Sequence, residues 1–197
     1  MPWLYLIRHP HTQIDPARPA SQWSLSDQGR AQVRALMALP LWKHVAAVYT
    51  SAQPKASAVG EAAHTVYAVP WHIQPALDEA RRDTWLGGAA FQTAQRAFFA
   101  QPETPPVRGW ESARQAGERF AGAMDSILGA HPAATIAVIA HATVLTLYVA
   151  RLRACPPTYE DWRAVDFAAI MVVDRATRRP LTPFVAAPYD GLPPPTD

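Results

Sequence analysis

Two histidines of this chain, His9 and His141, directly follow short apolar segments. The stretch WLYLIRHPHT runs through the apolar residues 3–7 before it reaches Arg8 and His9. The stretch TIAVIAHAT places His141 after the apolar residues 135–140. An imidazole can act as a nucleophile, as a general acid or base, or as a metal ligand. A single histidine at a strand end is more often a turn residue, so the two histidines indicate a functional site only if the fold brings them together. His11 is left as such a turn residue.

The elements that must position these histidines follow an alternating pattern. Short apolar segments of the kind found in strands covered on both faces occur at 3–7, 45–50, 135–140 and 167–173. Helical patterns lie between them, from Ser26 to Pro40, from Pro54 to about His64, after Ser112 and after His141. Strands that alternate with helices predict an α/β fold, a three-layer α/β/α sandwich with a mostly parallel central sheet.

Polar groups are expected to meet at one edge of this sheet. In open α/β sheets, ligands bind beyond the carboxyl ends of the strands. Arg8 and His9 end the first strand, Lys55 comes just after the second, and His141 ends a third. His141 would also lie at the start of the next helix, where the dipole and the free N–H groups favour an anion. The residues therefore predict a cationic crevice that binds phosphate.

The chain of 197 residues suits a single domain over 1–179, followed by a proline-rich tail over 180–197 that we expect to be extended or frayed. Residues 80–110 are predicted to form a helical or loop insertion over the active site. This insertion mixes arginines with aromatic residues. The aromatic rings either belong to the core, or they form a lid that selects the organic part of a substrate.

Composition excludes several classes of protein. The 18 basic and 16 acidic residues give a formal charge of +2, too balanced to indicate a nucleic-acid or membrane partner. Cys155 is the only cysteine, so an intrachain disulfide or a multi-cysteine metal site is excluded, and a reducing compartment such as the cytoplasm fits best.

Arg8 and His9 cut the first apolar segment too short for a secretory signal. Residues 133–150 have the length of a membrane span, but the central His141 favours a buried strand, a turn and a buried helix.

The ordered set of motifs over residues 3–150 resembles the histidine phosphatase superfamily, which is phosphoglycerate-mutase-like and has a branch of small phosphatases. The family opens with a strand and Arg-His-Gly-x-Thr, where this chain has LIRHPHT. Five further motifs follow in the family's order: WSLSDQGRAQ at 23–32, YTSAQPKASAVGEA at 49–62, Leu77-Asp78-Glu79, Trp110-Glu111-Ser112 and VIAHAT at 138–143.

The resemblance implies a phosphatase that acts on a small phosphorylated metabolite through a phosphohistidine intermediate, without a metal or another cofactor. His9 would be the nucleophile, and Glu79 would protonate the leaving oxygen and then activate water. Asp78 and Glu111 are rivals of Glu79 for this role. His141 would stabilise charge beside His9, together with the phosphate-binding residues Arg8, Lys55, Thr12 and Ala142. Candidates for substrate selection are Arg81, Arg82 and Trp85. A mutase is less favoured, because mutases of this family generally carry longer insertions.

Several positions depart from the family pattern. Lys55 stands where the family has arginine, Pro10 replaces a glycine, Asp15 replaces a phosphate-binding asparagine, and Ala142-Thr143 replaces paired glycines. A phosphatase fold that has lost catalysis and only binds a ligand is therefore an alternative. A metal-dependent hydrolase that uses His9 and His11 is another, although such a site usually sits in a barrel of ~250 residues. Oligomeric state is not predicted.

Overall fold

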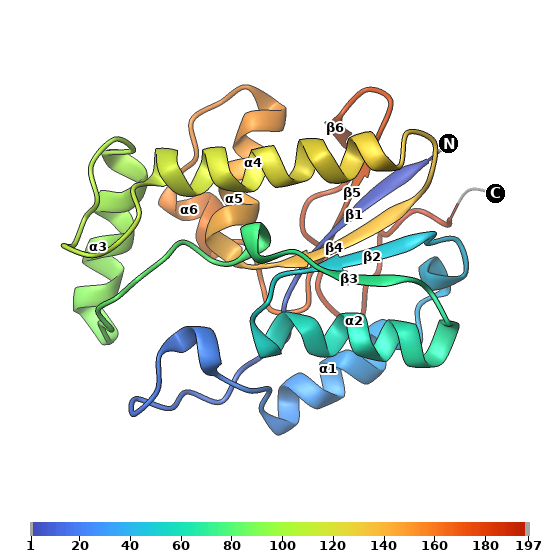
Figure 1. Ribbon diagram of the computed structural model, residues 1–197, viewed down its shortest axis with the longest axis horizontal. Coiled ribbons are helices and arrows are strands. Elements are labelled where there is room, and N and C mark those ends of the chain that lie inside the picture. The colour runs from blue at the N-terminus through green and yellow to red at the C-terminus, as the bar shows by residue number, and fades with distance from the viewer. Residues whose placement is uncertain (1, 196–197) are drawn as a thin grey trace.

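The computed structural model describes residues 2–195 and contains a six-stranded sheet (Figure 1). The strands stand in the order β3-β2-β4-β1-β5-β6. β3, β2, β4 and β1 pair parallel with one another, whereas β5 is antiparallel to β1 and β6 is antiparallel to β5. The predicted α/β fold with a mostly parallel sheet is thus confirmed. The strand bounds are β1 Trp3–Arg8, β2 Ala47–Thr50, β3 Trp71–Ile73, β4 Ile136–Ala140, β5 Ile170–Asp174 and β6 Arg179–Pro180.

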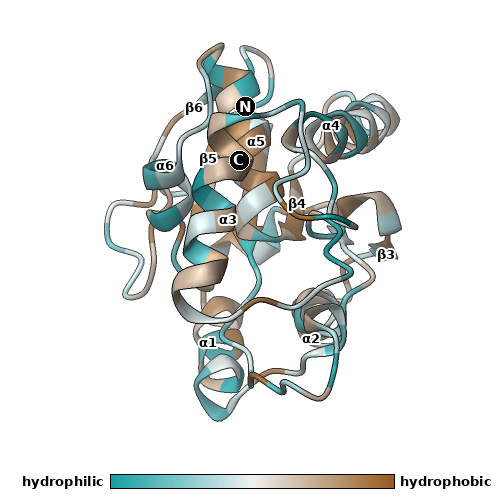
Figure 2. Ribbon diagram, turned by 90° about the vertical axis from the view of Figure 1, so that its left-hand side faces the viewer, coloured by the Kyte–Doolittle hydropathy of each residue, from teal (hydrophilic) through white to brown (hydrophobic). Residues whose placement is uncertain are grey.

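Helices cover both faces of the sheet, as a three-layer sandwich requires (Figure 1). On one face lie α1 (Asp27–Met37) and α2 (Pro54–Tyr67), and on the other lie α4 (Ala113–Ala130) and α5 (Ala142–Arg153). α3 (Gly88–Ala100) stands beyond the carboxyl ends of the parallel strands, the side that faces the viewer in Figure 2. The remaining helical elements are α6 (Tyr159–Arg163) and 3-10 turns at Ala20–Gln22, Pro40–Lys43 and Pro75–Leu77.

The core is divided by the sheet into two clusters. Alternate residues of β1 point to opposite faces, so Leu4 and Leu6 pack under α4 and α5 while Tyr5 and Ile7 pack under α1 and α2. Burial on both faces explains why the strands are continuous apolar runs. A shift of one residue along β1 would exchange the two sets, so this packing fixes the register that places Arg8 and His9 at the strand end.

Residues 133–150 form β4, a turn at His141, and α5, as the sequence predicted. Within residues 2–195, no helix has the length and apolar character needed to cross a membrane.

The C-terminal part of the sheet differs from the expectation. The strand predicted at 167–173 begins only at Ile170, because Phe167 and Ala168 form a turn in which Ala168 has a φ of 58°. The proline-rich segment after Pro180 returns onto the sheet. Val185 pairs with Ile170, and the hydroxyl of Tyr189 donates to Ala168 O at 3.1 Å.

Candidate active site

A cleft of about 540 Å³ lies at the carboxyl ends of the parallel strands. It is formed by the ends of β1 and β4, the start of α2, the 19–23 loop and the segment 78–83. Trp85 is the one residue of the predicted set that lies outside this cleft. The predicted residues that line it are Arg8, His9, Thr12, Lys55, Glu79, Arg81, Arg82, His141 and Ala142.

His9 is held in the form that a nucleophile requires. Its side chain is buried, and Nδ1 lies 2.8 Å from Pro10 O, a carbonyl that can only accept. Nδ1 therefore carries the proton and Nε2 keeps its lone pair. Burial lowers the pKa of His9 well below its usual value of 6.5, and the nearby Arg8 and Lys55 lower it further. His9 is thus a neutral imidazole at neutral pH.

His141 lies beside His9, with 4.9 Å between the ring centroids. Its Nε2 is 2.7 Å from Ser51 Oγ, and Nδ1 has no hydrogen-bond partner among the described residues. Burial, together with the proximity of His9, lowers the pKa of His141 well below 6.5. If the Ser51 hydroxyl donates to Nε2, the proton of neutral His141 is on Nδ1. This N–H is then free to donate to a ligand.

Two cationic side chains enter the cleft, Arg8 from the end of β1 and Lys55 from the start of α2. The Arg8 guanidinium lies 3.8 Å above the centroid of the Phe167 ring and donates to Val165 O. Burial lowers the pKa of Arg8 to about 10, so it stays charged at neutral pH. Lys55, from the first turn of α2, is 5% exposed and donates to Ala20 O. Burial lowers the pKa of Lys55 to about 8, an effect that Glu79 opposes.

The Glu79 side chain contacts the first turn of α5. Its Oε1 accepts from Ala80 N at 2.9 Å and its Oε2 from Thr143 N at 3.2 Å. Thr143 is in the first turn of the helix, where a free N–H and the dipole favour a carboxylate. The Glu79 carboxylate also lies 4.0 Å from Arg82 Nη2. The Glu79 carboxyl group is thus positioned in the cleft at the start of α5, the helix that His141 precedes.

The two rivals of Glu79 have different surroundings. Glu111 is almost fully buried outside the cleft lining and accepts both Arg119 Nε at 3.0 Å and Arg119 Nη2 at 2.7 Å. Arg119 also donates to the carbonyl oxygens of Ala76, Asp78 and Glu79, so this ion pair holds the segment that carries Glu79. Asp78 does line the cleft, accepts from Ala52 N at 2.8 Å, and has its pKa raised by burial.

The remaining residues that the sequence patterns singled out have the following surroundings. Thr12 is buried and bridges to Leu25, and Ala142 is the first residue of α5. Asp15, which would repel phosphate if it pointed inward, instead accepts from Ala17 N at 3.0 Å and pairs with Arg18 at 3.4 Å. His11 Nδ1 is 2.8 Å from Ser26 Oγ. In residues 2–195, no group of three or more His, Cys, Asp or Glu is arranged to hold a metal ion.

Three aromatic residues join the site, of which Phe91 lies in the predicted insertion over 80–110 and the other two were not singled out from the sequence. Phe91 from α3, Trp162 from α6 and Phe167 from the α6–β5 turn line the cleft. Phe167 supports Arg8 from below the guanidinium plane, a cation–π contact. No short motif marks Phe167, because it comes from a turn far along the chain from Arg8.

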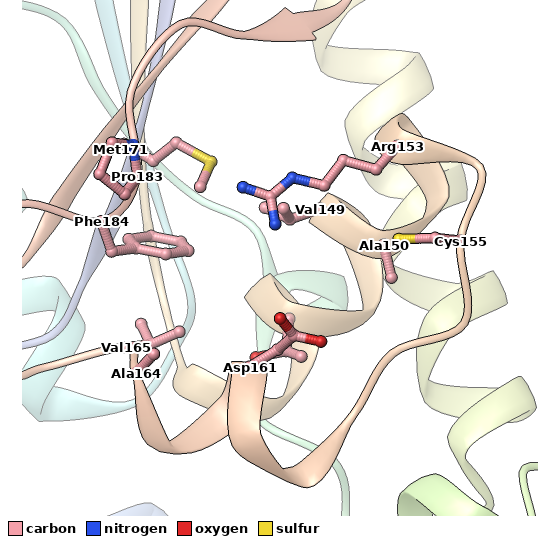
Figure 3. A pocket seen from close by; sticks show the side chains of 11 residues that line it. Val149, Ala150, Arg153, Cys155, Asp161, Ala164, Val165, Met171, Pro183 and Phe184 are labelled. Atoms are coloured by element: carbon pink, nitrogen blue, oxygen red, sulfur yellow. The ribbon is translucent and has the colours of Figure 1, made fainter.

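A separate cavity of about 210 Å³ lies between α5, α6 and residues 183–184 (Figure 3). Its lining includes Arg153, Cys155, Asp161, Met171 and Phe184. Val165 belongs to its lining, and the carbonyl of the same residue accepts from Arg8. None of the predicted site residues lines this cavity.

This fold and this arrangement of two histidines with cationic side chains define a phosphate-handling α/β enzyme class, and the comparisons identify the family. The chain belongs to the histidine phosphatase superfamily (branch 1), whose family model matches residues 4–183. A search of curated proteins gives no significant match.

Solved structures of low sequence identity share the fold. The Bacillus stearothermophilus protein YhfR is 21% identical with a TM-score of 0.71, and 97% of each chain is covered. A mycobacterial glucosyl-3-phosphoglycerate phosphatase complexed with VO3 is 18% identical with a TM-score of 0.73, covering 91% of this chain and 96% of the other. A phosphoserine phosphatase from Entamoeba histolytica, in complex with 3-phosphoglyceric acid, is 16% identical with a TM-score of 0.73, and the match covers 92% of this chain and 94% of the other.

Proposed function

We propose that the protein is a phosphomonoester hydrolase that transfers the phosphoryl group first to His9 and then to water. The observation that carries this proposal is the state of His9, a buried neutral imidazole whose Nδ1 is held by Pro10 O. Its Nε2 lone pair attacks phosphorus, and the bond from phosphorus to the ester oxygen breaks. Glu79, in its protonated form, gives its proton to that oxygen, and an alcohol leaves.

The second step returns the enzyme to its starting state. The Glu79 carboxylate takes a proton from water, the water oxygen attacks phosphorus, and the bond from His9 Nε2 to phosphorus breaks. Arg8, Lys55 and the free N–H of His141 offset the charge on the phosphoryl oxygens, which is most of what phosphoryl transfer needs. The substrate class is a small phosphorylated metabolite, in keeping with the glucosyl-3-phosphoglycerate phosphatase and the phosphoserine phosphatase that share the fold.

The test combines turnover with trapping of the intermediate. The wild type should hydrolyse p-nitrophenyl phosphate in the presence of EDTA and should form an acid-labile, base-stable phosphoenzyme. His9→Ala should lose at least 99% of the turnover and all of the label, because the nucleophile is gone, while its circular dichroism stays native. His11→Ala is the matched control and should keep its label, because His11 does not line the cleft and its Nδ1 lies 2.8 Å from Ser26 Oγ.

Three results would contradict the proposal. Label that persists in His9→Ala would place the nucleophile elsewhere. Turnover that EDTA abolishes, and that both histidine substitutions abolish, would favour a metal-dependent hydrolase using His9 and His11. Ligand binding without turnover or label would favour a phosphatase fold that only binds.

A further inference from the structure

A second hollow lies next to the cleft and is lined by none of the catalytic or phosphate-binding candidates, but by Arg82 and Trp85, two of the candidates for substrate selection. Its volume is about 460 Å³, and one wall is the 14–20 loop while the other is the segment 82–88. The residues that belong to both the cleft and this hollow are Pro19, Ala20, Trp23, Arg82, Asp83 and Phe91. Because the cleft and the hollow share these residues, the hollow lies beside the organic part of a ligand whose phosphate is at His9.

Four aromatic rings line the hollow, and the indole N–H groups of two of them are hydrogen-bonded within the protein. Trp23 Nε1 donates to Asp15 O at 2.9 Å, and Trp110 Nε1 donates to Thr84 O at 3.0 Å. The N–H groups of these two indoles are thus satisfied by backbone carbonyls, so Trp23 and Trp110 offer a ligand only hydrocarbon surface. We call the hollow lined by Trp23, Trp85, Phe91 and Trp110 the aromatic hollow.

Two large apolar side chains are exposed at its rim. Ile14 is 63% exposed and Trp85 is 50% exposed, and both line the aromatic hollow from opposite walls. The Trp85 indole lies against Gly87, where an added Cβ would be only 2.7 Å from the ring. Because Gly87 has no side chain, the Trp85 indole can lie against the backbone at this position. Exposed apolar side chains that gather at one hollow typically mark a binding site.

Arg82 separates the apolar part of the hollow from the charged floor of the cleft. Its guanidinium lies 5.1 Å from the centroids of both Phe91 and Trp110, and Nη2 donates to Thr143 Oγ1 at 2.9 Å. The charged groups other than Arg82 in the hollow are Arg18, which pairs with Asp15, and Asp83. Apart from these charged groups and Thr84, the lining side chains are apolar, so the hydroxyl groups of a ligand that lost water there would find few hydrogen-bond partners, which is unfavourable.

We propose that the aromatic hollow binds the organic part of the substrate and that the preferred substrates are phosphate monoesters of apolar alcohols. This inference rests on the proposed function, since it assigns the substrate class of the same site. It follows the usual construction of a small-molecule site, in which a few polar groups orient the ligand and apolar walls hold the rest.

Alkylphosphonates test the inference without requiring turnover, because they carry the charged headgroup and cannot be hydrolysed. The affinities of ethyl-, butyl- and hexylphosphonate should be measured by isothermal titration calorimetry. Each methylene group that enters the hollow should tighten binding by about two- to fourfold. In Trp85→Ala and in Ile14→Ser, the ratio of hexyl to ethyl affinity should fall at least threefold. Val66→Ser, an exposed aliphatic residue on α2 away from the hollow, should keep the wild-type ratio.

Turnover of the corresponding alkyl phosphates, whose leaving alcohols are similarly basic, separates this inference from the proposed function. A kcat/KM that rises from ethyl to hexyl phosphate supports both. Affinity that rises with chain length in the absence of turnover would overturn the hydrolase proposal and keep the apolar site. Affinity that does not change with chain length, or a ratio that Val66→Ser lowers as much as Trp85→Ala does, would overturn the inference.

Discussion

At the scale of single residues, Lys55 is the most informative departure from the family pattern. Its ammonium group is buried in the cleft, where the family has an arginine, and it keeps the charge without the planar fork of a guanidinium. Lys55→Met should lower kcat/KM for p-nitrophenyl phosphate about ten- to a hundredfold, because a charged hydrogen bond contributes about 1.5–3 kcal/mol. Lys55→Arg should keep the activity or raise it. A change below about twofold in both variants would show that Lys55 does not contact the phosphate.

The pKa of Lys55 also predicts how activity depends on pH. Burial lowers this pKa to about 8, so the side chain is protonated below that pH and loses its charge as the pH rises through it. We expect kcat/KM to fall as the pH rises above about 8, since the neutral amine no longer stabilises the phosphoryl oxygens. In Lys55→Arg this alkaline decline should move to higher pH, because a guanidinium keeps its proton. An unchanged pH profile in that variant would assign the decline to another group.

At the scale of secondary structure, the start of α1 fixes the loop that follows β1. Ser26 caps the helix by accepting from Gly29 N at 3.1 Å, and Ser26 N donates to His11 O at 3.2 Å. A Cβ added at Gly29 would lie 2.0 Å from His11 O, a distance that no side chain can adopt. The glycine therefore lets the helix approach the backbone of the loop that carries His9.

Gly29→Ala should thus lower both stability and activity. Relief of the clash requires the helix start or the His11 backbone to move, at a cost of about 1–3 kcal/mol in the free energy of unfolding. The shift of the loop should also lower kcat/KM, which a purely local defect would not do. Urea denaturation and steady-state kinetics measure the two effects. Gly122→Ala in α4, where an added Cβ meets open space, is the control and should raise stability by about 0.5–1 kcal/mol. Equal effects of the two substitutions would refute the close-approach argument.

At the scale of the whole molecule, the fold was largely predictable because it depends on apolar runs that the sheet buries on both faces. Arg8, His9 and His141 could be placed together because they end parallel strands, whose carboxyl ends share one edge. β3 and β6 were missed because they have only three and two residues, too few for a periodic pattern. The orientation of the Asp15 side chain could not be predicted either, because its contacts with Ala17 N and Arg18 determine where the carboxylate points. Phe167 was taken for part of a strand, and only the turn at Ala168 brings its ring under Arg8.

Because the cleft draws on β1, α2, β4 and α5 together, an anion bound there should stabilise the whole fold. A ligand at 100 times its Kd adds about 2.7 kcal/mol to the free energy of unfolding. For a chain of this size, that amount corresponds to a rise in Tm of about 5–10 °C. We expect this rise with inorganic phosphate in the presence of EDTA, relative to chloride at equal ionic strength. At the same phosphate concentration, Lys55→Met should show roughly half the rise, because a tenfold weaker Kd removes about 1.4 kcal/mol. Equal rises in the two proteins would mean that Lys55 does not contribute to phosphate binding.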